Sequence, residues 1–179
     1  MLKVSIPEQE LWDEKTNTFV KVPKFDLQLE HSLVSISKWE SKWHKPFLGK
    51  DEKTPDEVLD YIRCMTLNQN VDPTIYQWIP ESVLTEISKY IEDPMTATTF
   101  NDNSKKRNTE IITNEIIYYW MVSFNIPFEC QKWHLNRLLT LIRVCSIKNQ
   151  PGEKMTTREI LEQNRALNQL RKAQLHTRG

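Results

Sequence analysis

The sequence predicts an α+β protein that is predominantly α-helical, with an N-terminal β-hairpin or small antiparallel sheet packed on a helical core. Up to about residue 32 apolar residues alternate with polar ones, which is typical of strands. Beyond that point they recur every three or four residues, as on the buried face of a helix. We therefore expect three regions: a β region over 1–32, a helical core over 33–150 and a polar, basic C-terminal helix or tail over 151–179.

Three short apolar runs predict the strands, over residues 2–6, 19–22 and 25–29. Prolines bound these runs where a strand needs no backbone donor. The polar segment from Trp12 to Thr18 contains Asp and Asn, which favour turns, so we expect the hairpin turn between the first two runs to lie there. A sheet of two or three strands is only marginally stable alone, and we expect it to dock on the rest of the chain or on a partner.

Three helices have clear boundary signals. The first runs from the capping residue Ser32 to Trp43 and ends before Pro46. The second follows Thr54, which supplies a capping hydroxyl before a proline and two acids. The third opens at Pro80 and closes before Pro94. In the second helix we expect the buried side to consist of Val58, Leu59, Ile62, Met65 and then Leu67.

The C-terminal half predicts a loop and three more helices. Residues 94–108 break the pattern and predict a long loop. Residues 110–125 are apolar almost all round, which predicts a helix surrounded by its own protein. From Thr156 onward the chain is helical by propensity but poor in apolar residues, which predicts a projecting or frayed helix whose burial a partner completes. Residues 128–148 predict an amphipathic helix with a stripe of Leu135, Leu138, Leu139, Ile142 and Cys145.

Composition narrows the class of protein. The 24 Lys and Arg residues balance 24 Asp and Glu residues, so no general attraction to nucleic acid is expected. Only 3 glycines are present, too few for a glycine-rich phosphate loop. No apolar run reaches the roughly 18 residues of a membrane span, and no signal peptide is visible, so we expect a soluble intracellular protein without a membrane partner. The three cysteines, in apolar helix-like sequence, predict reduced thiols: Cys64, Cys130 and Cys145.

No motif predicts catalysis. Cys130 and His134 lie four residues apart, but a structural zinc site takes four ligands, and neither Cys-x-x-Cys nor His-x-x-x-His is present. The same pair shows no signal of the facing base and oxyanion donor that a cysteine nucleophile requires. The segment Glu30–His31–Ser32 is either an acid/base cluster or a helix cap with a hydrogen-bonded imidazole, and the cap is favoured. We expect no enzyme activity, no cofactor and no metal.

Two of the six tryptophans, Trp39 and Trp43, lie one helical turn apart among basic residues. Core packing is the first explanation of this pair, a protein interface the second and a stacking platform for single-stranded nucleic acid the third. As a hypothesis we assign the pair and a following phenylalanine to a partner-binding surface. We add the basic loop, which can touch an acidic partner or phosphate. The candidate residues are Trp39, Trp43, Phe47, Lys105, Lys106 and Arg107.

Three segments resemble a known family. Residues 27–43 (LQLEHSLVSISKWESKW), 94–100 (PMTATTF) and 126–142 (IPFECQKWHLNRLLTLI) are similar to tail assembly chaperones, also called tail morphogenesis proteins, of long-tailed bacteriophages and prophages. The likeness covers most of the chain from Phe25 to Gly179.

The resemblance implies a non-catalytic protein, made in the host cytoplasm during phage assembly, that binds the tape measure protein and recruits tail-tube subunits. A tape measure helix exposes apolar stripes until the tube encloses it, and a helical partner with aromatic grooves can cover them.

Two alternatives stay open. A minor structural protein of the tail, connector or baseplate would remain in the virion, and its hairpin would augment a neighbour's sheet. A small nucleic-acid-binding regulator would instead show salt-dependent binding to DNA or RNA. The sequence also leaves open a homo-oligomer and a frameshifted longer product.

Overall fold

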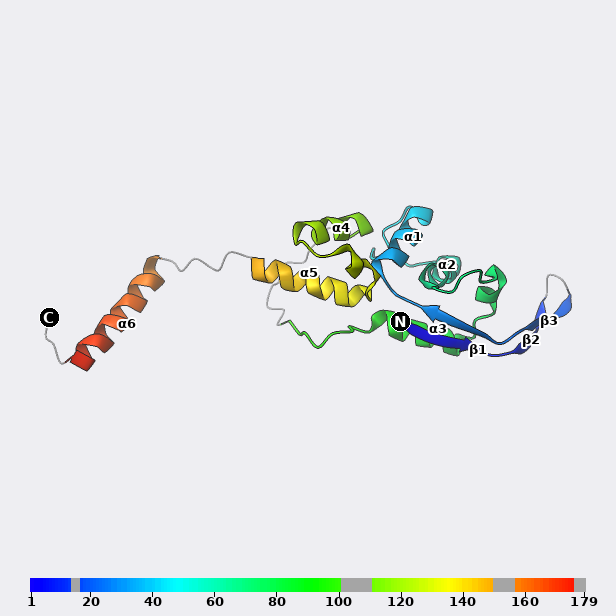
Figure 1. Ribbon diagram of the computed structural model, residues 1–179, viewed down its shortest axis with the longest axis horizontal. Coiled ribbons are helices and arrows are strands. Elements are labelled where there is room, and N and C mark those ends of the chain that lie inside the picture. Colours follow the sequence, from blue (N-terminus) through cyan, green and yellow to red (C-terminus); the bar gives the residue numbers. More distant parts are fainter. Residues whose placement is uncertain (14–16, 101–110, 150–156, 176–179) are drawn as a thin grey trace. The chain divides into compact units, whose positions relative to one another are not determined.

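The structure is a computed structural model that describes residues 1–13, 17–100, 111–149 and 157–175 of the 179-residue chain. It divides into two compact units, residues 1–145 and 146–179. The first unit contains the β strands and most of the helices (Figure 1), so the fold is α+β and mostly helical, as predicted. The predicted β region and most of the predicted helical core lie together in this unit. Lys105, Lys106 and Arg107 lie outside the described residues.

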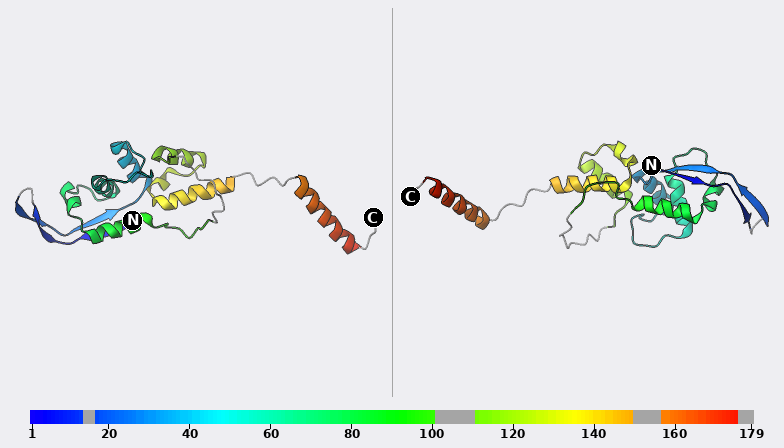
Figure 2. Two further views of the ribbon diagram at one scale, coloured as in Figure 1. Left: turned by 180° about the vertical axis from the view of Figure 1, so that it is seen from behind. Right: turned by 90° about the horizontal axis from the view of Figure 1, so that it is seen from below.

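The strands form one long antiparallel ribbon with a break in it. β1 (Leu2–Ile6) pairs with β4 (Phe25–Leu29), and β2 (Gln9–Asp13) pairs with β3 (Thr18–Val22). The second pair continues the register of the first without a shift: Ile6 lies opposite Phe25, and Gln9, three residues later, lies opposite Val22, three residues earlier. The two residues skipped on each side of the ribbon include Pro7 and Pro23, which have no N–H to donate. Figures 1 and 2 show β2 and β3 projecting beyond the helices of this unit.

Strand β2 was not predicted. The predicted turn over residues 12–18 is too long, because Trp12 and Asp13 belong to β2 and Thr18 to β3. It joins β2 to β3, whereas the first apolar run, β1, pairs with β4. The sequence of β2 has only one adjacent apolar pair, Leu11–Trp12, and its strand conformation depends on pairing with β3 rather than on its own alternation.

The helices at 33–43, 55–65 and 81–92 agree with prediction. α1 (Leu33–Trp43) is capped by Ser32 and α2 (Pro55–Met65) by a capping box, in which Thr54 and Glu57 bond each other's backbone N–H. A short 3₁₀ helix, η1 (Pro73–Trp78), precedes α3 (Glu81–Glu92).

The prediction that Val58 and Leu67 are buried was wrong, because both are exposed. The buried face of α2 passes through Tyr61, Ile62 and Met65, which leaves Val58 on the solvent side. Leu67 lies beyond the helix end, where the chain is extended and its N–H donates to the carbonyl of residue 28 at 2.8 Å.

The predicted helix over 128–148 is in fact two helices. A 3₁₀ helix, η2 (Phe128–Lys132), is followed by extended backbone at Trp133 and then by α5 (Leu135–Asn149). The break lets His134 form a β-bridge with Ser32, and the Leu135 N–H donates to the carbonyl of residue 31 at 2.7 Å. This contact fixes the start of α5 against the start of α1.

The core of the first unit lies where strands β1 and β4 meet the helices. α4 (Asn114–Ser123) covers a shorter range than the predicted 110–125. In the second unit, α6 (Thr157–Leu175) accounts for most of the described residues. Among the described residues, no helix has both the length and the apolar character needed to cross a membrane. The largest fully buried side chains are Trp39, Ile6, Leu27, Leu29, Leu33, Ile36, Ile62, Met65, Ile87, Ile117, Met121 and Leu135.

Candidate partner-binding surfaces

The predicted aromatic surface is mostly core. Trp39 is 1% exposed and Phe47 is 8% exposed, so the assignment of these two residues to a partner-binding surface was wrong. The Trp39 indole N–H is satisfied internally by the carbonyl of Glu57 at 2.9 Å. Trp43 is half-buried and still presents part of its ring to solvent. Helical spacing places the two indoles on one side of α1, but the packing of α2 decides which of them is covered.

The rings of Trp43 and four buried residues form a row through the first unit. The ring centroids of Trp43 and Trp39 lie 6.2 Å apart, those of Trp39 and Phe47 5.2 Å, and those of Phe47 and Tyr61 4.0 Å. The row continues to His31, whose ring lies 5.8 Å from that of Tyr61. The candidate aromatics are therefore brought together, and their shared role is to pack α1 against α2.

The row ends in two buried histidines, His31 and His134, whose rings lie 5.0 Å apart. Nδ1 of His31 shares a hydrogen bond with the Tyr61 hydroxyl at 2.5 Å, and Nε2–H of His134 donates to the Tyr90 carbonyl at 2.9 Å. Burial, with a smaller contribution from His134, lowers the pKa of His31 to about 3. The imidazole of His31 is therefore neutral at physiological pH and acts as a packed, hydrogen-bonded core residue, as the capping interpretation predicts.

The structure also places the residues considered for metal binding. Cys130 and His134 are both buried, but Cys130 belongs to η2 and His134 to the break before α5, so they do not share one helical turn. Within the described ranges, no group of three or more His, Cys, Asp or Glu side chains is placed to hold a metal ion.

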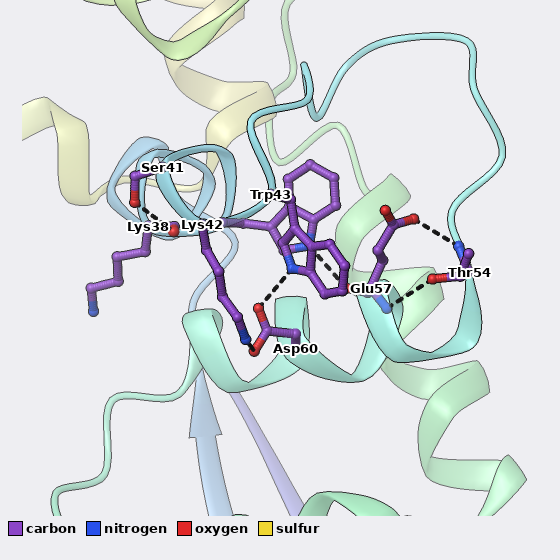
Figure 3. Close-up of polar contacts among 8 residues, drawn as sticks. Lys38, Ser41, Lys42, Trp43, Thr54, Glu57 and Asp60 are labelled. Carbon is purple, nitrogen blue, oxygen red and sulfur yellow. Dashed lines mark hydrogen bonds and ion pairs between the residues drawn. The ribbon is translucent and has the colours of Figure 1, made fainter.

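A shallow groove of about 560 Å³ lies where Trp43 of α1 meets α2 and η1. Figure 3 shows Lys42 and Trp43 reaching from α1 to Asp60 on α2. The Trp43 indole N–H donates to Asp60 Oδ2 at 2.9 Å, and Lys42 Nζ donates to Asp60 Oδ1 at 2.5 Å. The indole is therefore held in one orientation at the groove wall. The groove is lined by Lys42, Trp43, Asp56, Leu59, Asp60, Arg63, Pro73, Tyr76 and Gln77.

A second hollow, of about 380 Å³, adjoins the groove and shares Lys42, Asp60 and Arg63 with it. Its remaining lining residues are Lys38 and Cys64, so three cations surround one carboxylate. Burial raises the pKa of the Cys64 thiol despite these cations, which keeps the thiol protonated and a poor nucleophile. The hollow is thus a basic recess rather than a reactive cysteine site.

Helix α4 exposes apolar side chains, contrary to the prediction that its own protein surrounds it. Tyr119 is 68% exposed and Val122 is 59% exposed. They lie three residues apart and share the face opposite the buried Ile117 and Met121. On neighbouring η2, Phe128 is 53% exposed, and its ring lies 6.3 Å from that of the half-buried Tyr118 of α4. We call Tyr118, Tyr119, Val122 and Phe128 the α4 face.

Helix α3 provides an internal comparison for the α4 face. Its buried side consists of Val83, Ile87 and Tyr90, as in any amphipathic helix. Every exposed position of α3 is polar, so this helix has no exposed apolar patch of the kind found on α4. The exposed residues of α3 are Glu81, Ser82, Thr85, Glu86, Ser88, Lys89 and Glu92.

The ribbon has an aromatic pair near its tip. Trp12 and Phe19 lie directly opposite each other on β2 and β3, and their rings meet edge to face at 5.0 Å. Both are exposed, while Val22, on the other face of the ribbon, is buried. Cross-strand aromatic pairs stabilise two-stranded ribbons, so this pair has a structural role of its own.

Sequence reasoning missed the α4 face although a signal was present. The segment Ile116–Val122 is apolar at nearly every position, and a single helix packed on one side cannot bury all of them.

Scanning the chain against protein-family models, and searching both curated proteins and solved structures, found no match.

Proposed function

We propose that this chain is a non-catalytic tail morphogenesis protein of a long-tailed bacteriophage, a chaperone that binds the tape measure protein and recruits tail-tube subunits around it. The family resemblance of the three segments supplies the identity of the partners. The α4 face supplies the physical means of binding. The protein would act in the host cytoplasm during assembly.

One observation carries the proposal: α4 exposes Tyr119 and Val122, whereas α3 of the same unit exposes only polar residues. An exposed apolar patch flanked by polar residues is typical of protein interaction sites. On α4 the flanking polar residues are Glu115 and Ser123, both exposed. A patch of this kind suits an amphipathic helix, whose own apolar stripe it can cover.

The small size of the α4 face also suits a chaperone, which must bind reversibly. Tail-tube subunits must finally replace the chaperone on the tape measure protein, so the complex has to dissociate. A few aromatic and aliphatic side chains with a polar rim give a small interface, and small interfaces are typical of transient complexes. Tyr119 and Val122 stay exposed in the free chain because the fold leaves them outside its core.

The experiment measures the affinity of the full chain for the tape measure protein of the same phage. The double variant Tyr119→Ser/Val122→Ser should weaken binding by about tenfold or more, since each lost side chain is a candidate anchor of the interface. The variant should remain folded, because both side chains lie in solvent. Val58→Ser, which removes another exposed valine, from α2, is the control and should bind like the wild type. Unchanged affinity of the double variant would remove the α4 face as the binding site.

A structural protein of the tail, connector or baseplate is the second candidate, and the ribbon is the observation that favours it. Beyond the prolines, β2 and β3 pair only with each other within the described residues, so each has a free edge. Free strand edges can add to a neighbour's sheet. Mass spectrometry of purified particles separates the two candidates: a chaperone is absent from the virion, and a structural protein is present in stoichiometric amount.

A further inference from the structure

We infer that the groove at Trp43 and the adjoining basic hollow form one binding site for an acidic polypeptide segment. Carboxylates of the segment would pair with Lys38 and Arg63, and a neighbouring apolar side chain would pack on Trp43. This site is separate from the α4 face and does not depend on the proposed function.

The charges of the site leave two cations available. Both oxygens of Asp60 are already engaged, Oδ1 with Lys42 and Oδ2 with the Trp43 indole. The negative charge of Asp60 therefore balances the positive charge of Lys42. Among the described residues, neither Lys38 nor Arg63 has a carboxylate partner, and both are exposed. In Figure 3 the Lys38 side chain points away from Asp60. The recess therefore has unpaired positive charge at its rim, which an acidic side chain complements.

The second acid that lines the groove, Asp56, lies away from Arg63. Asp56 is in the first turn of α2 and Arg63 is in the last, about 10 Å along the helix axis. This separation gives the groove a negative end and a positive end. A bound segment would accordingly place its carboxylates toward Arg63, whose planar guanidinium can hold a carboxylate with two parallel hydrogen bonds.

The apolar part of the site is held in place before a partner arrives. Trp43 is fixed by its hydrogen bond to Asp60, and Leu59 and Tyr76 line the same groove. Tyr76 is itself held, since its hydroxyl donates to Thr66 Oγ1 at 2.9 Å. A wall fixed in this way loses little side-chain entropy on binding.

A peptide fits the site better than a nucleic acid does. Single-stranded nucleic acids follow grooves with cations along their length and stack their bases on exposed aromatic faces. Here the two available cations both line the adjoining hollow, Asp56 would repel a phosphate in the groove, and Trp43 is half-buried. A segment with one or two carboxylates beside an aliphatic or aromatic residue matches both the charge and the wall.

The test selects peptides from a random dodecapeptide library on the immobilised full chain and measures the selected peptides by fluorescence anisotropy. Enriched sequences should carry Asp or Glu next to a large apolar residue. Arg63→Glu should weaken their binding by about tenfold or more, because it replaces the attraction by repulsion. Lys89→Glu, the same change at an exposed lysine of α3, is the control and should bind as the wild type does.

Three further measurements decide the outcome. Binding should weaken as salt is added. It should persist in Tyr119→Ser/Val122→Ser, which separates this site from the α4 face. Circular dichroism verifies that Arg63→Glu is folded, and the milder Arg63→Gln should weaken binding in the same direction. Selection without acidic enrichment, unchanged affinity in Arg63→Glu, or Arg63-dependent binding of labelled oligothymidylate in place of peptides would each overturn the inference.

Discussion

Glu40 of α1 accepts two hydrogen bonds from Asn114, a residue 74 positions later in the chain. Its Oε2 receives the backbone N–H of Asn114 at 2.8 Å and the side-chain Nδ2 at 2.6 Å. The other oxygen, Oε1, receives the backbone N–H of Phe47 at 2.6 Å. Thr113, the residue at the N-cap of α4, makes no side-chain cap bond, so Glu40 satisfies this helix start instead. One buried carboxylate thus fixes the helix that carries the α4 face.

Replacing Glu40 should therefore destabilise the fold strongly. Glu40→Ala leaves three buried or part-buried donors without their acceptor, and we expect the free energy of unfolding to fall by about 3 kcal/mol. Urea denaturation followed by circular dichroism measures it. Glu86→Ala, at an exposed position of α3, is the control and should change stability by less than about 0.5 kcal/mol. Equal effects of the two substitutions would contradict the capping role.

The buried His31 makes stability depend on pH. Its pKa is about 3 in the folded chain and 6.5 when unperturbed, so below pH 6.5 the unfolded chain binds a proton that the folded chain does not. Titration of His31 therefore leaves the free energy of unfolding nearly unchanged above this pH and lowers it as the pH falls toward 3. Between pH 7 and pH 5 we expect His31 to lower the free energy of unfolding by about 2 kcal/mol.

The control for this prediction is His31→Gln, which has no titrating ring. Urea unfolding of both proteins at pH 7 and pH 5 gives the drop for each, and only the difference between the drops matters. This window lies mostly above the range in which carboxylates protonate. A drop in His31→Gln as large as that of the wild type would show that another group causes it.

Two neighbouring leucines of α5 should differ in their contribution to stability. The amphipathic stripe predicts both Leu138 and Leu139 to be core, but Leu138 is fully buried and Leu139 only half-buried. Leu138→Ala should cost about 2–5 kcal/mol through the cavity it leaves, and Leu139→Ala should cost clearly less. Thermal or urea unfolding ranks the two. The reverse order would mean that α5 is rotated from the orientation described.

Features with local signals were predictable from the sequence. The capping box of α2 needs only Thr54 and Glu57, and the start of α1 needs only Ser32, so both helices were predicted correctly. Strand β2 was not predictable, because its pairing with β3 rather than its own composition makes it a strand.

The candidate surface was harder to predict than the helices. Spacing places Trp39 and Trp43 on one side of α1, but only the packing of α2 determines that Trp39 is buried and Trp43 borders a groove. The link from Glu40 to Asn114 joins distant segments, and no pattern in either segment indicates it. The outward orientation of Tyr119 depends in the same way on where α4 is held.

The most direct test of the proposed function is photo-cross-linking from the α4 face. Benzoylphenylalanine is placed at position 119, or at position 85 on the polar side of α3, and the full chain is irradiated with the tape measure protein of the same phage. The proposal predicts a cross-link to the tape measure protein from position 119 and none from position 85. Absence of a cross-link at position 119, or equal cross-linking from both positions, would contradict it.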